Sequence, residues 1–81
     1  MELHYTERFR RNYEGAPEHI QRAFNRRAVY LARDLRHPSL RAKKYDEARD
    51  IWQARANGGW CFYFQIKSNS YWLLDLLPHP K

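Results

Sequence analysis

Hydrophobic and aromatic residues gather in three runs near the end of the chain, at 51–56, 60–66 and 71–77. Each run is short and bounded by a turn signal, a pattern typical of an antiparallel meander of strands. The two turns read as three residues each, Asn57 to Gly59 and Ser68 to Ser70. Because a turn of odd length preserves the odd and even phase between neighbouring strands, residues of one parity are expected to share a face throughout.

Polarity within the meander follows this parity. Even positions are mostly apolar and predict a core face, whereas odd positions keep returning to polar residues and predict an open face that could carry a site. The expected core face gathers Trp52, Ala54, Ala56, Trp60, Phe62, Phe64, Trp72, Leu74 and Leu76. The expected open face gathers Gln53, Arg55, Cys61, Tyr63, Gln65, Asp75 and His79, together with the exposed apolar residues Tyr71, Leu73 and Leu77.

The first half of the chain changes to a helical period. A short strand is expected over 1–5, followed by helices over roughly 7–14 and 17–35, with apolar residues at helical spacing. Pro38 closes the second helix, and a further short strand is possible over 43–45. The order of strand, two helices and then three or four strands predicts an α+β fold, with the helices packed on the even-numbered face of a mainly antiparallel sheet.

Size and charge narrow the class of protein. A chain of 81 residues is expected to form one domain, 1–81. It carries a net charge of +6, and eleven of its fifteen cations are arginine, which suits a nucleic acid or an acidic protein partner. A single cysteine excludes an internal disulfide and fits a reducing cytoplasm, and neither a membrane-spanning run nor an apolar signal core is present.

Several kinds of catalytic site lack their motif in this sequence. There is no phosphate-binding glycine loop, no nucleophile elbow and no metal-ligand spacing among the four histidines and Cys61, so neither a cofactor nor a metal is expected. Cys61 and His79 share the open face, but Cys61 should lie opposite Leu77, with His79 about 6–7 Å further along. A thiolate–imidazole pair is therefore disfavoured.

Metal-free cleavage of RNA remains. It needs a base for the 2′-OH proton, cations for the phosphorane charge and an acid for the leaving oxygen. His79 could serve as acid or base near neutral pH, and Tyr63 could stack a base or orient a phosphate. The cations able to hold phosphate are Arg41, Lys43, Lys44, Arg55 and Lys81. Alternatively, His79 is part of a plain tail, Lys43 and Lys44 form a solvated pair, and the polyanion surface is the helical arginine stripe of Arg22, Arg26, Arg33 and Arg36.

Three segments carry a family resemblance across nearly the whole chain: DLRHPSLRAKKYD at 34–46, IWQARANGGWCFYF at 51–64 and YWLLDLLPHPK at 71–81. They resemble the RelE/ParE superfamily of type II toxin–antitoxin toxins, and within it the RelE-like branch. The resemblance implies a RelE-like microRNase fold, with two N-terminal helices on a twisted antiparallel sheet in the order β-α-α-β-β-β. It also implies a ribosome-dependent endoribonuclease that cuts translated mRNA by 2′-OH attack.

The resemblance further implies an antitoxin that wraps the toxin, so that operator DNA is contacted only through the antitoxin. His79 matches the family's C-terminal catalytic residue, whereas Cys61 stands where the family has an arginine, which predicts a weakened active site. Lys43 and Lys44 are the nearest matches to the family's base, and Glu47 is a further one. Two other readings stay open: a ParE-like, non-enzymatic inhibitor of DNA gyrase, and an inert module that binds antitoxin or forms a repressor.

Overall fold

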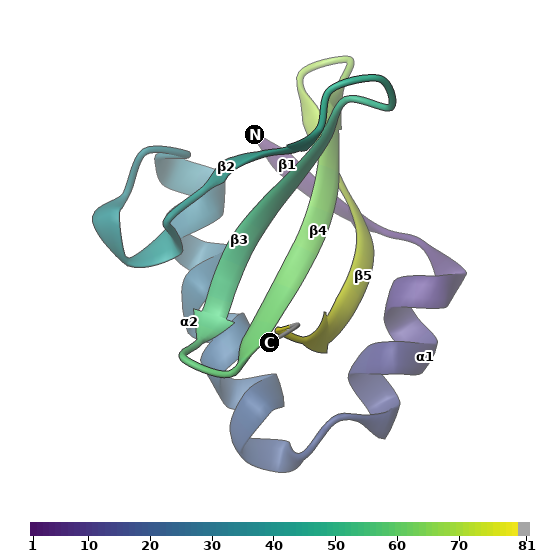
Figure 1. Ribbon diagram of the computed structural model, residues 1–81, viewed down its shortest axis with the longest axis vertical. Coiled ribbons are helices and arrows are strands. Elements are labelled where there is room, and N and C mark those ends of the chain that lie inside the picture. Colours follow the sequence, from purple (N-terminus) through teal and green to yellow (C-terminus); the bar gives the residue numbers. More distant parts are fainter. Residues whose placement is uncertain (80–81) are drawn as a thin grey trace.

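Five strands form one mixed sheet with two helices packed on it in the computed structural model of the chain, which describes residues 1–79 (Figure 1). The sheet order is β1-β5-β4-β3-β2, with β1 parallel to β5 and every other pair antiparallel. The expected α+β class is confirmed, and four strands follow the helices rather than three. The elements are β1 (Glu2–Tyr5), α1 (Glu7–Gly15), α2 (Glu18–Arg33), the short 3-10 helix η1 (Pro38–Leu40), β2 (Lys43–Asp46), β3 (Ile51–Asn57), β4 (Trp60–Lys67) and β5 (Ser70–Pro78).

Local hydrogen bonds set the helix ends. The Thr6 hydroxyl caps α1 by accepting a hydrogen bond from the Phe9 backbone N–H at 3.2 Å. Helix α2 ends two residues earlier than expected, because Asp34 is extended and its carboxylate accepts from the Arg36 backbone N–H at 2.9 Å. Within residues 1–79 no helix is long and apolar enough to cross a membrane.

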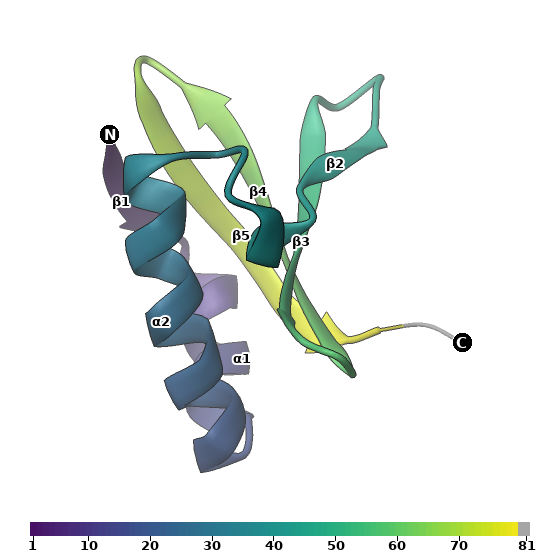
Figure 2. The ribbon, with the colours of Figure 1, turned by 90° about the vertical axis from the view of Figure 1, so that its left-hand side faces the viewer.

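Helix α2 lies across one face of the sheet, and the core fills the space between them (Figure 2). The Phe24 ring of α2 meets the Phe62 ring of β4 edge to face, with ring centroids 5.1 Å apart. Phe62 and Phe64 are fully buried. The core phase expected for β3 and β4 is therefore confirmed.

The first hairpin keeps the expected phase by a different route. Its turn is two residues long, Gly58 and Gly59, and not three. A two-residue turn alone would pair even with odd positions, but a bulge between Arg55 and Asn57 shifts the register by one. As a result Ala54 lies opposite Phe62, and both are buried in the core.

The second hairpin reverses the expected phase, and this part of the prediction is wrong. Its turn contains only Ser68 and Asn69, both with positive φ (49° and 62°), as in the hairpin turns that match strand twist. No bulge follows at once, so even positions of β4 pair with odd positions of β5. Tyr71 and Leu73 are consequently buried in the core, whereas Trp72 is 37% exposed.

A second bulge then restores the phase near the end of β5. The register shifts between Tyr63 and Phe64 on β4, so that Leu76 lies opposite Phe62 and returns to the core. Leu74, expected in the core, is only half-buried. Asp75 and Leu77 lie on the opposite face, as expected, and Leu77 is exposed. The final part of β5 is therefore the part that can contribute to a site on the open face.

Candidate functional site

One row of residues crosses four strands on the open face. Lys43 on β2 lies opposite Gln53 on β3, which lies opposite Tyr63 on β4. Tyr63 in turn lies opposite Asp75 on β5. Side chains directly opposite one another in antiparallel strands are in contact range, so this row brings an ammonium, an amide, a phenol and a carboxylate together.

Gln53 and Tyr63 form a buried polar pair at the centre of this row. The Gln53 side-chain amide donates to the Tyr63 hydroxyl oxygen at 3.0 Å, and both residues are less than a tenth exposed. Burial raises the pKa of the Tyr63 phenol, while the hydrogen bond from Gln53 acts in the opposite direction. The hydroxyl therefore keeps its proton at neutral pH. Because its oxygen already accepts from Gln53, its hydrogen is left to donate to a bound group.

The next row holds Cys61, where the family resemblance predicts an arginine. Cys61 lies opposite Arg55 on one side and opposite Leu77 on the other, as expected. Cys61 is almost fully buried, and this burial raises the pKa of its thiol, which the nearby charges of Arg55 and Lys43 only partly offset. The thiol is therefore neutral at physiological pH, and it supplies neither a thiolate nor a positive charge.

His79 follows β5 at the end of the sheet where the β3–β4 turn lies. Its backbone N–H donates to the Gly59 carbonyl at 2.8 Å, which ties the end of the described chain to that turn. The half-buried His79 thus stands at the Arg55 end of the open face and away from the Lys43 end. Lys81, also expected to bind RNA, lies outside the described residues.

A hollow of about 510 Å³ opens on this face, within the range typical of ligand sites. Tyr45, 57% exposed, stands over it with its ring 5.0 Å from that of Tyr63, edge to face. Tyr45 occupies a bulge in β2, which no sequence pattern indicated. The lining residues are Thr6, Arg8, Tyr45, Arg49, Ile51, Tyr63, Leu74, Asp75, Leu77 and Pro78.

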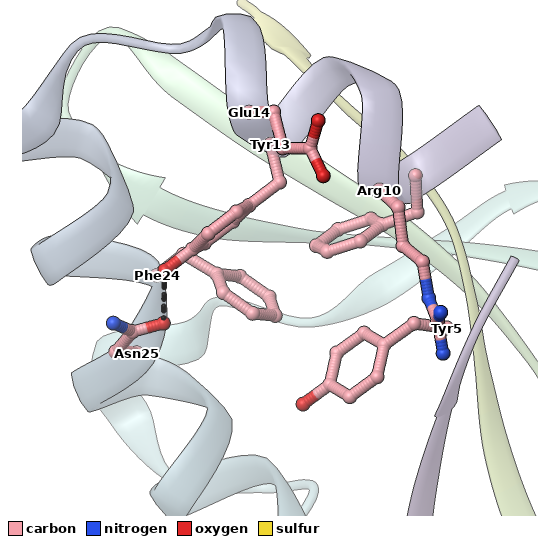
Figure 3. Close-up of a pocket in the computed structure, with 7 residues that line it drawn as sticks. Tyr5, Arg10, Tyr13, Glu14, Phe24 and Asn25 are labelled. Atoms are coloured by element: carbon pink, nitrogen blue, oxygen red, sulfur yellow. Dashed lines mark hydrogen bonds between the residues drawn. The ribbon is translucent and has the colours of Figure 1, made fainter. Parts of the chain in front are cut away.

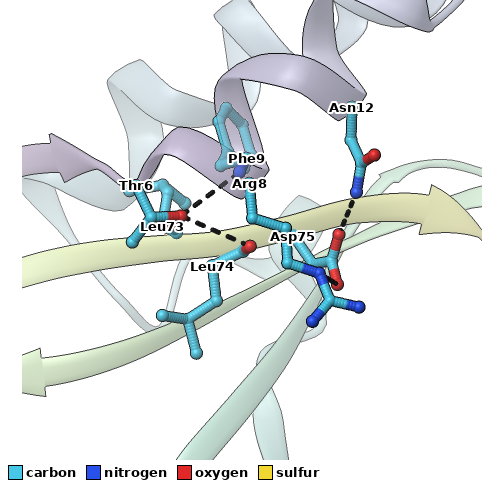
Figure 4. Close-up of polar contacts among 7 residues, drawn as sticks. All are labelled: Thr6, Arg8, Phe9, Asn12, Leu73, Leu74 and Asp75. Atoms are coloured by element: carbon cyan, nitrogen blue, oxygen red, sulfur yellow. Dashed lines mark hydrogen bonds and ion pairs between the residues drawn. The ribbon is translucent and has the colours of Figure 1, made fainter.

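Helix α1 neutralises the acidic member of the row. Asp75 forms an ion pair with the Arg8 guanidinium, at 3.2 Å, and accepts a hydrogen bond from the Asn12 amide (Figure 4). The N-terminus of α1 is anchored on the same strand, because the Thr6 hydroxyl donates to the Leu73 carbonyl at 2.8 Å. Asp75 is thereby held as a structural carboxylate, and its charge is largely cancelled at the rim of the hollow. No sequence pattern indicated a role for Arg8 or Asn12.

The two neighbouring lysines point to opposite faces of β2. Lys43 shares the open face with Gln53, whereas Lys44 lies opposite Trp52, with its ammonium 5.0 Å from the indole ring. Lys44 also forms ion pairs with Asp50 and, at 4.0 Å, with Glu47. The hydrogen bond to Asp50 raises the pKa of Lys44. Lys43 alone of the two therefore faces the site.

Arg41 and Arg55 come together at a second hollow, of about 430 Å³. Arg55 reaches the Gly58 carbonyl with a long hydrogen bond of 3.4 Å, and Arg41 lies in the left-handed region after η1, with φ of 47°. Arg27 of α2 joins them, which sequence spacing did not indicate. The remaining lining residues are Pro38, Ser39, Asn57 and Gly58.

An aromatic pocket of about 330 Å³ lies between α1, α2 and β1 (Figure 3). Its walls are the rings of Tyr5, Phe9, Tyr13 and Phe24, and the Tyr13 hydroxyl donates to the Asn25 amide oxygen at 2.9 Å. Arg10, Glu14 and Asn25 complete the lining, so the pocket is mostly apolar, and it carries none of the predicted catalytic residues. It therefore suits an apolar group better than a phosphate. Within residues 1–79 no three His, Cys, Asp or Glu side chains gather as a metal site would require.

Neither a protein-family model nor a curated protein sequence matches this chain. Solved structures do. A YoeB/ParE toxin from Agrobacterium tumefaciens is 13% identical, covers 99% of this chain and 100% of its own, and superposes with a TM-score of 0.82. A chain of the RelBE2 toxin–antitoxin complex from Mycobacterium tuberculosis is 22% identical over 96% of both chains, with a TM-score of 0.78. The isolated Escherichia coli RelE toxin is 11% identical, with 99% and 85% covered and a TM-score of 0.76. The chain therefore has the fold of the RelE/ParE superfamily toxins.

Proposed function

We propose that this chain is the toxin of a type II toxin–antitoxin pair and cuts translated mRNA on the ribosome by metal-independent 2′-OH attack. The observation that carries the proposal is the row on the open face, where Lys43 lies opposite the buried Gln53–Tyr63 pair and next to the row of Arg55 and Cys61. Of these residues, Tyr63 lines the open hollow. Similarity of fold to solved toxins supports the class of protein.

Each group then has a chemical role. Lys43 and Arg55 supply positive charge where the phosphorane develops, and the free hydrogen of the Tyr63 hydroxyl donates to a phosphate oxygen. Tyr45, exposed above the hollow, can stack on a base. The imidazole of His79 can transfer a proton near neutral pH, either from the 2′-OH or to the leaving oxygen.

Cys61 weakens this site. A buried, neutral thiol replaces the guanidinium that the family resemblance leads us to expect between Arg55 and Tyr63. Losing one such charge-stabilising donor lowers the rate by about 10²–10³. Slow cleavage is therefore expected from the unmodified chain.

The test is mapping of mRNA ends after incubation with translating ribosomes. Cys61→Arg should raise cleavage by about 10²–10³, and adding His79→Ala should remove much of the gain. Cys61→Leu is the matched control, because it adds bulk at the same buried position without charge. Absence of cleavage by the unmodified chain and by a folded Cys61→Arg variant would exclude the endoribonuclease.

One observation favours a second candidate. The same neutral Cys61 suits a chain that no longer cleaves and acts only by binding protein. An inert antitoxin-binding module and a ParE-like gyrase inhibitor both belong to this class. If no cleavage is found, inhibition of gyrase supercoiling by the purified chain would identify the gyrase inhibitor. Absence of that inhibition would leave the inert antitoxin-binding module.

The proposed partner is a cognate antitoxin. Toxin–antitoxin complexes are among the solved structures of the same fold, including the YoeB–YefM complex from Staphylococcus aureus. Tyr71 and Leu73, predicted to contact the antitoxin, are buried in the core, so they cannot serve. Leu77, which is exposed, and the aromatic pocket of Figure 3 are two apolar surfaces that remain available to a partner. Stable recovery of a fully active toxin from a host without any antitoxin would argue against this partner.

A further inference from the structure

Three arginines from three separate elements line the 430 Å³ hollow beside the open face. Arg27 lies in the middle of α2, Arg41 directly follows η1, and Arg55 lies in β3. Each of the three is 14 residues from the next along the chain, so only the tertiary fold brings them together. Among the described residues, no carboxylate lines this hollow.

The positive charge of this cluster is left without a partner in the described chain. None of the three arginines forms a salt bridge within residues 1–79, although six other ion pairs are present there. The Nε of Arg27 is buried and makes no hydrogen bond.

We propose that Arg27 and Arg41 together bind one phosphate of an RNA strand, at a subsite next to the scissile phosphate that Arg55 contacts. Guanidinium groups bind phosphate oxygens with paired hydrogen bonds, and two of them can hold a single phosphate. Arg55 lines this hollow and also lies opposite Cys61 on the open face, so the hollow and the proposed site are adjacent. The choice of RNA as the source of the phosphate rests on the proposed function, whereas the anion site rests on the cluster alone.

The salt dependence of binding distinguishes one shared site from scattered surface charge. Each phosphate contact with a single strand contributes about 0.7 to the slope of log K against log salt concentration. If Arg27 and Arg41 are both needed to hold the same phosphate, Arg27→Gln, Arg41→Gln and the double variant should each lose about 0.7 from the slope. Independent cations would instead lose about 1.4 in the double variant.

The measurement uses fluorescence anisotropy with a labelled single-stranded oligoribonucleotide whose 2′-hydroxyls are methylated, so that binding is read without cleavage. Arg26 is the exposed residue that precedes Arg27 in the same helix. Arg26→Gln removes an equal charge and is the matched control. It should leave the slope unchanged. Arg27→Lys keeps the charge but not the paired donors and should weaken binding. Thermal unfolding checks that each variant is folded, and the exposed Arg41 supplies a test that does not disturb the core.

Three results would overturn the proposal: additive losses in the double variant, an equal loss in Arg26→Gln, or an unchanged slope in both single variants. An unchanged slope in both single variants, combined with weaker binding of a glutamate-rich peptide by those variants, would assign the hollow to an acidic protein instead. Failure of the proposed function is seen separately. In that case ribosome-dependent cleavage is absent, while the shared loss of slope persists with the uncleavable strand.

Discussion

Removing the Tyr63 hydroxyl tests the polar centre of the site. In Tyr63→Phe the Gln53 amide loses its acceptor, at 3.0 Å, in a place where both side chains are almost fully buried. A buried donor without a partner costs about 1–3 kcal/mol. A domain of 81 residues has a free energy of unfolding of about 4–12 kcal/mol. The variant should therefore lose a measurable share of its stability, with its melting temperature lowered by about 4–8 °C for each kcal/mol.

Urea unfolding followed by circular dichroism measures this loss. Tyr45→Phe is the matched control, because this neighbouring tyrosine is 57% exposed and the change should stay within about 0.5 kcal/mol. Adding Gln53→Leu to Tyr63→Phe replaces both partners by apolar groups and should recover part of the loss. The reasoning is refuted if Tyr63→Phe is as stable as Tyr45→Phe, or if the double variant is no more stable than Tyr63→Phe alone.

Three further predictions follow from burial, strand face and ionisation. Phe64→Ala should lower the free energy of unfolding by about 3–5 kcal/mol in urea titrations. Trp72 is half-exposed, so Trp72→Ala should lower it by clearly less, and equal losses would contradict the core assignment. Lys43→Ala should reduce the salt slope of RNA binding by about 0.7, whereas Lys44→Ala should leave the slope unchanged and lower the melting temperature. Burial raises the pKa of the Cys61 thiol, so the thiol of the unfolded chain ionises at a lower pH than that of the folded chain. The free energy of unfolding should therefore keep the full contribution of the neutral thiol below about pH 8.5 and fall above it. Cys61→Ala should move that fall towards the tyrosine range near about pH 10, and an unchanged profile would exclude the thiol as its cause.

Local sequence patterns determined the elements and most of the core. The helical period placed both helices to within two residues of their observed ends, and alternation in 51–56 and 60–66 predicted which face of β3 and β4 is buried. These features depend on neighbours a few residues apart, so a periodicity in the chain records them directly. The opposition of Cys61 and Leu77 was also predicted, but it holds only because the bulge in β5 offsets the shorter turn.

Tertiary structure decided the phase of β5 and the make-up of the site. A two-residue turn at Ser68 and Asn69 reversed the faces of β5, and a bulge reversed them again, neither of which a hydrophobic pattern specifies. Pairing of β1 with β5 joins the two ends of the described chain, and the ion pair between Arg8 and Asp75 depends on that long-range contact. The convergence of Arg27 with two distant arginines likewise has no local signal. Sequence periodicity therefore fixed which residues could be polar and accessible, and only the folded arrangement of strands and helices determined which of them meet.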